Sequence, residues 1–280
     1  MDAALRTSDP TQLHLWTRGS AGSGQVPFQT KIVALLTVLA IVIFLILMPA
    51  MPQDQSYHAF ADRRALLGIP NFWDVVSNFP FAVVGLIGLF RFRDFPARIV
   101  FLGVFCTAFG SAYYHLSPDD ARLFWDRLPM TVAFMSVFAI AIRQPRLVVQ
   151  LVIVGIASVV WWRLTNNLWP YGLVQFGSLA ALVVIAFRSE PGLWPVIGWY
   201  GLSKVAEHFD KQIYSVFPLS GHTLKHLLAA LGAWYIVRWL QSRKFSVLRG
   251  GKLLEWAPEW RIVKGRQCRR TRPLKDRFQS

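Results

Sequence analysis

Long apolar runs dominate the sequence and constrain its fold more than any other feature. The clearest is Lys31 to Met51, which is uncharged after its first residue, and about 20 such residues match a bilayer hydrocarbon core roughly 30 Å thick. Seven more apolar runs follow it: Phe72 to Phe90, Ile99 to Tyr114, Leu123 to Ile142, Leu147 to Trp162, Trp169 to Phe187, Leu193 to Val205 and Leu224 to Leu240. Leu193 to Val205 is the weakest of them. The pattern predicts an all-α, polytopic membrane helical bundle.

The composition supports the membrane class. Of the 280 residues, 54% are hydrophobic and 16% are charged, whereas soluble domains run at about 45–50% and about 25%. This composition excludes intrinsic disorder and argues against a soluble globule. The two cysteines, Cys106 and Cys268, are too few for a disulfide framework or a thiolate zinc site. A metal would therefore have to be held by histidine and carboxylate.

The chain organisation follows from these runs. The polar breaks between them are too short for a separate soluble domain. We therefore expect an N-terminal tail over 1–30, a transmembrane anchor over 31–51, a seven-helix domain over 52–241 and a basic tail over 242–280. A cleavable signal peptide is the alternative for 31–51. The long segment before it and the missing small-residue cleavage site favour the anchor.

The net charge of +15 is explained by topology. Lysine and arginine gather in alternate connections and in the tails: Arg6, Arg18, Lys31, Arg91, Arg93, Arg98, Arg143, Arg146, Arg188 and many positions after Leu240. By the positive-inside rule, that side is cytoplasmic and both termini lie inside. We expect no nucleic-acid partner, and the basic C-terminal tail is suited to anionic lipid head groups.

Histidines gather on the opposite, non-cytoplasmic side. Five of the six lie at span ends or loops there: His58, His115, His208, His222 and His226. His222 and His226 are four residues apart at the start of the last span, so a helix places both imidazoles on one face. The spacing suits metal chelation, and it equally suits two interfacial histidines.

A second polar group lies at the same depth. Ser111 and His115 are four residues apart at the end of the third span, and Asp126 follows a short turn. A divalent ion and its water would give these groups a common partner. An ion pair with Arg127 is the alternative for Asp126. Because no glutamate lies between His222 and His226, a general base must come from elsewhere, and Asp126 is the natural candidate.

Taken together, these motifs resemble the alkaline ceramidase family, within the superfamily of seven-span membrane hydrolases that includes the progestin and adiponectin receptors. The similarity spans Tyr57 to Leu240. It rests on NFWDVVSN at Asn71 to Asn78, GS-x3-H at Gly110 to His115, Asp-x-Leu-Pro-Met at Asp126 to Met130, and the final GH-x3-H pair.

The resemblance implies a function and a site. The function is hydrolysis of the N-acyl bond of a ceramide-like lipid, which enters from the bilayer and yields a fatty acid and a long-chain base. The implied Zn2+ is ligated by His115, His222 and His226 with a water in the fourth position. Asp126 would deprotonate that water, and Ser111 would donate to the developing oxyanion. The active site would face the non-cytoplasmic side.

The chain also departs from that family. The Lys31 to Met51 span is additional to the seven shared ones. The stretch before the first shared span offers only Asp62 and Asn71 as oxygen ligands, so calcium dependence is doubtful. Two other classes stay open: a receptor-like or sensory protein with structural zinc, and, more weakly, a transporter, since the mid-span regions hold few charges.

Several other polar residues are predicted to have structural roles. Asn71, Asp74, Ser77 and Asn78, in the first shared span, are predicted to satisfy neighbouring helices rather than face the site. Lys204 and Glu207 are spaced for an i, i+3 ion pair.

Overall fold

The computed structural model describes residues 47–246 and 255–258, together with Ile32, Leu36, Leu39, Ala40, Ile43 and Phe44. The chain divides into two units, Met1–Pro49 and Ala50–Ser280. In the first unit, the described positions from Ile32 to Leu47 are helical. Nearly half of the predicted 31–51 anchor, the whole 1–30 tail and most of the basic tail lie outside the described residues.

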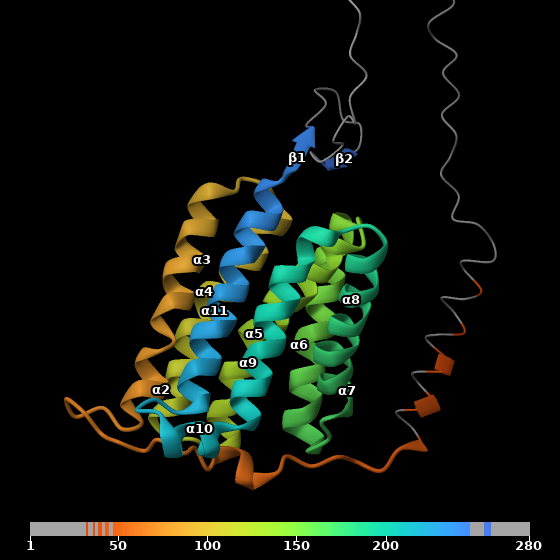
Figure 1. Ribbon diagram of the computed structural model, residues 1–280. Helices are drawn as coiled ribbons and strands as arrows, with labels where there is room; N and C mark the ends of the chain where they lie inside the picture. Colours follow the sequence, from red (N-terminus) through yellow and green to blue (C-terminus); the bar gives the residue numbers. More distant parts are fainter. Residues whose placement is uncertain are drawn as a thin grey trace, which may run out of the picture. The chain divides into compact units, whose positions relative to one another are not determined.

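The second unit is a bundle of antiparallel helices (Figure 1). The helices are α2 (Phe72–Val76), α3 (Phe79–Arg91), α4 (Phe95–Leu116), α5 (Asp120–Ala141), α6 (Val148–Thr165), α7 (Trp169–Gly172), α8 (Ser178–Arg188), α9 (Trp194–His208), α10 (Asp210–Val216) and α11 (Gly221–Gln241). A π-helical turn, η4 (Leu173–Gly177), joins α7 to α8, and 3-10 turns η3 (Pro145–Leu147) and η5 (Pro191–Leu193) precede α6 and α9. The helical prediction is confirmed for this unit.

Among the described residues, five segments are long and apolar enough to cross a membrane: Phe72–Arg91, Phe95–Leu116, Asp120–Ala141, Pro145–Thr165 and Trp169–Arg188. They coincide with five of the predicted runs, and the protein is therefore an integral membrane protein.

The last two predicted spans form helices but fall outside that set. Helix α9 has 15 residues, fewer than the about 20 that a span needs. Helix α11 has 21 residues, but His222, Lys225, His226 and Arg238 lower its hydropathy. The two helices pack against each other, and α11 also packs against α3. The seven-span topology stays a prediction.

Side-chain caps fix where the helices of the site begin. Asp119 accepts a hydrogen bond from the backbone N of Arg122 at the start of α5, and Ser220 accepts one from Thr223 at the start of α11. These caps satisfy backbone donors that a helix start leaves free. They set which residues of α5 and α11 face the interior.

Close packing of α4 on α5 depends on glycines. A Cβ on Gly103 would lie 2.7 Å from the backbone nitrogen of Ala133, and one on Gly110 would overlap the Trp125 carbonyl. Small residues allow membrane helices to approach closely. The contact at Gly110 is adjacent to Asp126, so it brings that carboxylate toward the end of α4.

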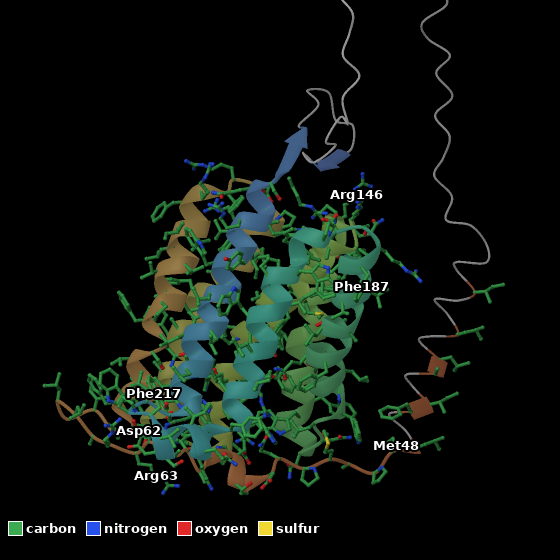
Figure 2. The ribbon with its side chains drawn as sticks, viewed as in Figure 1. Met48, Asp62, Arg63, Arg146, Phe187 and Phe217 are labelled. Carbon is green, nitrogen blue, oxygen red and sulfur yellow. The ribbon has the colours of Figure 1, made fainter. Side chains whose placement is uncertain are left out.

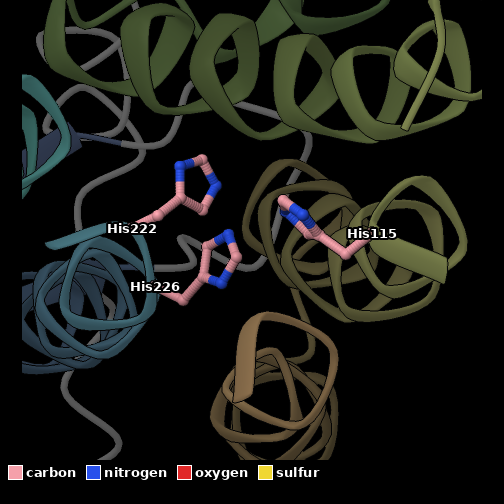
Figure 3. A group of neighbouring side chains, drawn as sticks. All are labelled: His115, His222 and His226. Carbon is pink, nitrogen blue, oxygen red and sulfur yellow. The ribbon is translucent and has the colours of Figure 1, made fainter. Parts of the chain in front are cut away.

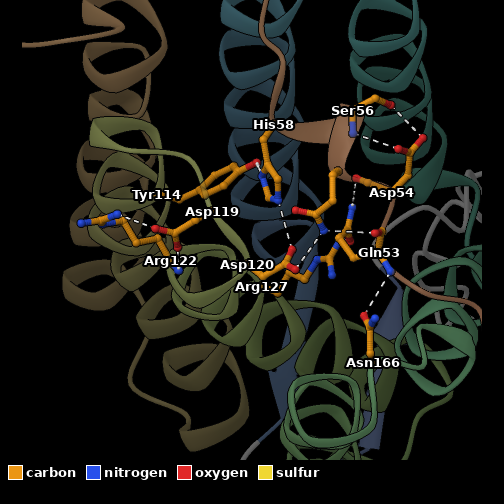
Figure 4. A network of polar contacts seen from close by, with 11 residues as sticks. Gln53, Asp54, Ser56, His58, Tyr114, Asp119, Asp120, Arg122, Arg127 and Asn166 are labelled. Carbon is orange, nitrogen blue, oxygen red and sulfur yellow. Dashed lines mark hydrogen bonds and ion pairs between the residues drawn. The ribbon is translucent and has the colours of Figure 1, made fainter.

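Residues 50–64, here called the strap, cross the end of the bundle that carries the histidines. The backbone N of Met51 donates to Asn167, and that of Gln53 donates to Asn166. His58 contacts Asp120 at 3.0 Å. Figure 4 shows part of this polar network. The strap thereby ties α4, α5 and the α6–α7 turn together.

Further strap contacts reach the last helices. Tyr57 donates to Glu207 on α9 at 3.1 Å, and the backbone N of Ala61 donates to Asp210 on α10 at 2.9 Å. Within the strap, the Ser56 hydroxyl and backbone N–H hydrogen-bond Asp54 and hold the pKa of that carboxyl below its usual value. The strap closes the end of the bundle at which the histidines lie.

The other end of the bundle is basic. Figure 2 labels Arg146 there, while Asp62 and Arg63 lie at the histidine end. At the basic end, Glu190 forms ion pairs with Arg143 and Arg243. Burial lowers the pKa of Arg243 to about 10, although the Glu190 carboxylate opposes that effect. The chain alternates between the ends as the sequence predicts.

Two further elements were not predicted. Helix α10 occupies the expected loop between α9 and α11. The strands β1 (Arg243–Ser246) and β2 (Glu255–Pro258) form an antiparallel pair at the start of the predicted tail.

Candidate metal centre

Three histidines from two helices converge inside the bundle (Figure 3). His115 comes from the last turn of α4, and His222 and His226 come from the first turns of α11. Their ligand nitrogens lie within 4.8 Å of one another. The ring centroids are 4.8, 4.8 and 4.9 Å apart, which makes a nearly equilateral triangle.

The start of α11 is anchored on α10 and α9. The backbone N of His222 donates to Asp210 at 2.7 Å, and a Cβ on Gly221 would overlap the carbonyl of Ala206. Glycine therefore lets α11 begin against α9. The i, i+4 spacing then turns both imidazoles toward α4.

The hydrogen bonds of the three rings leave nitrogens free for a ligand. Both nitrogens of His115 are buried without a hydrogen-bond partner. Nδ1 of His226 lies 2.8 Å from the Ser77 hydroxyl, which leaves Nε2 for the interior. Nε2 of His222 lies 3.4 Å from Nζ of Lys225, which leaves Nδ1. A buried polar atom without a partner costs about 1–3 kcal/mol. A metal ion would remove that cost for His115.

A zinc ion fits this donor set. Two zinc–nitrogen bonds of about 2.0–2.1 Å that meet at a tetrahedral angle hold their nitrogens about 3.3–3.4 Å apart, so side-chain rotations would bring the three nitrogens onto one ion. Three histidines with an open fourth position are typical of catalytic rather than structural zinc sites. The histidine group can therefore hold a metal ion.

Asp126 and Ser111 lie beside the histidines. Both are buried, and both line the same cavity as His226. Arg127, the alternative partner of Asp126, instead donates to Gln53 at 2.6 Å and stacks on Trp162. The five residues selected from the sequence thus lie at one end of the bundle.

The cavity has a volume of about 130 Å³ and is lined by α3, α4, α5, α8, α9 and α11. Its polar lining includes Ser111, Asp126 and His226, and its lining on α11 continues to Ile236. Ten helical residues at 1.5 Å each make this distance about 15 Å. Apolar side chains form most of the remaining wall. The cavity suits a molecule with a polar head and a long apolar chain.

Ser77 contacts a candidate metal ligand, which the sequence did not predict. Asp74 accepts hydrogen bonds from Thr223 at 2.7 Å and Ser220 at 3.3 Å, and Asn78 donates to the Asp74 carbonyl, as expected for residues that satisfy neighbouring helices. Ser77 instead contacts His226. A second residue that the sequence reasoning missed is Phe60 of the strap, whose ring covers His115 and His222 at centroid distances of 4.8 and 4.3 Å.

Two lysines were also missed as part of the site. Lys225 and Lys204 line the cavity. Glu207 accepts from both at 2.6 Å, so the predicted Lys204–Glu207 pair is confirmed and extended. The sequence did carry a signal for Lys225, which lies between His222 and His226 in an otherwise apolar helix. Charged residues inside a membrane helix usually have a function.

The other two histidines on this side stay apart from the cluster. His58 bonds to Tyr114 at 2.8 Å, and His208 is exposed and contacts Phe209.

Neither a scan against protein-family models nor a search of curated proteins finds a match to this chain.

Proposed function

We propose that the protein is a zinc-dependent intramembrane amidase that hydrolyses the N-acyl bond of a ceramide-like lipid. One observation carries the proposal: a cluster of three histidines adjoins an apolar cavity within the bundle, and one of them, His226, lines that cavity together with Asp126 and Ser111. The resemblance of the motifs to alkaline ceramidases supports the same reaction.

Each residue has a chemical task in this reaction. His115, His222 and His226 would hold the zinc ion, which would supply an activated water by lowering its pKa to about 7. Asp126 takes the proton from the attacking water and passes it to the leaving amine. Ser111 donates a hydrogen bond to the oxyanion that develops on the amide carbonyl. Ser77 holds the His226 ring in the orientation that ligation needs.

The cavity favours a lipid as the substrate. Its apolar part extends about 15 Å along α11, so an acyl chain can lie there while the amide reaches the histidine end. Such a substrate dissolves in the bilayer and enters between helices. The strap covers the histidine end and limits the access of bulk water to the site.

The decisive experiment uses purified full-length protein. The bound metal is measured by atomic emission, and fatty-acid release is measured from a labelled ceramide. We expect zinc near one equivalent and turnover that Asp126→Asn lowers by about 10²–10⁴-fold and Ser111→Ala by about 10²–10³-fold.

The matched control is Asp94→Asn. Asp94 caps α4 at the basic end of the bundle, and asparagine caps helices equally well, so this variant should keep full turnover. Full turnover in Asp126→Asn and in His222→Ala would refute the proposed chemistry.

A further inference from the structure

The polar end of the cavity holds more charge than amide hydrolysis requires. Two ammonium groups, Lys204 and Lys225, line it together with the Asp126 carboxylate. Three imidazoles, the Asp126 carboxylate and the Ser111 hydroxyl would serve a neutral amide without these lysines. Because charged groups inside a membrane protein are costly, their presence calls for an explanation.

Glu207 neutralises the charge of the two lysines only in part. Its Oε1 accepts from Lys225 and from the Tyr57 hydroxyl, and its Oε2 accepts from Lys204. One carboxylate thus forms ion pairs with two ammonium groups. Each ammonium has three N–H donors. Lys225 also lies 3.4 Å from Nε2 of His222, so Lys225 keeps at least one donor and Lys204 keeps two for a ligand in the cavity that they line.

Asp126 lines the same cavity, but among the described residues no ion pair joins it to either lysine. Two ammonium groups thus share the single carboxylate of Glu207. A negative charge on the substrate would restore the balance, because buried charges are stable only when paired.

We propose that Lys204 and Lys225 bind a single anionic group, a carboxylate or a phosphate, on the amine side of the lipid amide. The amine side is favoured because the apolar wall leads away from the lysines along α11 and leaves that direction to the acyl chain. The inference rests on the proposed function for the nature of the scissile bond. It adds to that function a preference, among ceramide-like lipids, for those that carry an anion on the amine side.

The test measures binding separately from hydrolysis. The probe is the ketone analogue of N-dodecanoylglycine, in which CH2 replaces the amide NH so that no bond can be cleaved. Its neutral comparator is the same ketone with a primary amide in place of the carboxylate, and a third arm carries a phosphate monoester. Binding to the zinc-loaded full-length protein is measured by calorimetry in an uncharged detergent.

We expect the acid to bind about 10–100-fold more tightly than the neutral comparator, since hydrogen bonds to charged groups are worth about 1.5–3 kcal/mol. Lys204→Met and Lys225→Met should each remove most of that preference. In each single variant Glu207 keeps its ion pair with the other lysine, so the Glu207 carboxylate never loses both of its cationic partners. The control, Lys211→Met, removes an exposed lysine on α10 and should keep the preference.

Equal binding of acid and neutral ketone by the wild type would overturn the inference, and so would a preference that survives in both lysine variants. The relative affinities of the carboxylate and phosphate arms identify the natural anion. Acid-selective binding in a protein that hydrolyses no amide would refute the proposed function and leave the lysine site standing.

Discussion

His226 is oriented by a residue distant in the sequence. Ser77 lies 149 positions away, and its hydroxyl is 2.8 Å from Nδ1 of His226. A hydrogen bond to the second ring nitrogen fixes the tautomer and orientation of a ligating histidine, and its loss typically costs 10–100-fold in metal affinity. We therefore expect Ser77→Ala to bind zinc about 10–100-fold more weakly, as measured by competition with a chelator.

Ser158→Ala is the matched control for that measurement. Ser158 is also a buried helical serine, but its hydroxyl donates to the Gly155 carbonyl within α6. Its removal should leave zinc affinity unchanged. Equal affinities of Ser77→Ala and the wild type would show that the hydroxyl does not orient the ligand.

The sequence revealed the candidate ligands but not their supports. His222 and His226 were recognisable because a four-residue spacing always shares a helix face, and His115 because it ends a span. Ser77 and Phe60 could not be recognised, since their partners lie on other helices and only tertiary packing brings them together. Lys225 was visible as a charge, but its pairing with Glu207 depends on how α9 packs against α11.

At the scale of elements, α4 and α5 must approach closely to place Asp126 beside the histidines. A Cβ on Gly110 would overlap the carbonyl of Trp125, which precedes Asp126. Overpacking of this kind costs about 1–3 kcal/mol. We expect Gly110→Ala to lower the free energy of unfolding by that amount and to reduce turnover, as followed by denaturant unfolding in detergent and by fatty-acid release.

Gly198→Ala on α9 separates this packing effect from a general effect of glycine replacement. A Cβ there meets no atom within 4 Å, and alanine favours the helix by up to about 1 kcal/mol. This variant should be as stable as the wild type or more so. If Gly110→Ala behaved in the same way, the close approach of α4 and α5 would not matter for the fold.

The strap depends on side chains at the end of α6. Asn166 has a positive φ of 52° and accepts from the backbone N of Gln53 at 3.2 Å. Asn166→Gly keeps the left-handed backbone accessible but removes the acceptor. We expect faster hydrogen exchange at the Gln53 amide, measured by mass spectrometry on strap peptides. Unchanged exchange at Gln53, relative to strap peptides around Ala61, would mean that this bond does not hold the strap.

Sequence periodicity predicted the long elements well and the irregular ones poorly. The apolar runs coincide with α4, α5 and α6 because hydrophobic length alone defines a span. The break between α2 and α3 and the π-helical turn before α8 arise from local hydrogen bonding inside apolar stretches, where hydropathy carries no signal. Helix α10 is too short to show a period.

At the scale of the whole molecule, charge predicts orientation. Arg143 and Arg146 lie at the basic end of the bundle, which we expect to face the cytoplasm. The histidine end, where Lys211 lies, should then face away from it. In a protein with Cys106 and Cys268 replaced by serine, Lys211→Cys should react with an impermeant maleimide added to intact cells, and Arg146→Cys only after permeabilisation. The reverse labelling pattern would contradict the proposed orientation.

Metal binding should also stabilise the whole bundle, because the three ligands join α4 to α11 and no such cluster exists in the unfolded chain. At free zinc 100 times Kd, the gain is about 2.7 kcal/mol, which corresponds to about 5–10 °C in Tm for a domain of this size. Chelation should therefore lower the Tm of the wild type and leave that of His115→Ala unchanged. His208→Ala, which removes an exposed histidine outside the cluster, should respond to chelation as the wild type does. A Tm that is insensitive to chelation in protein shown to have carried zinc would place the metal outside the histidine triangle.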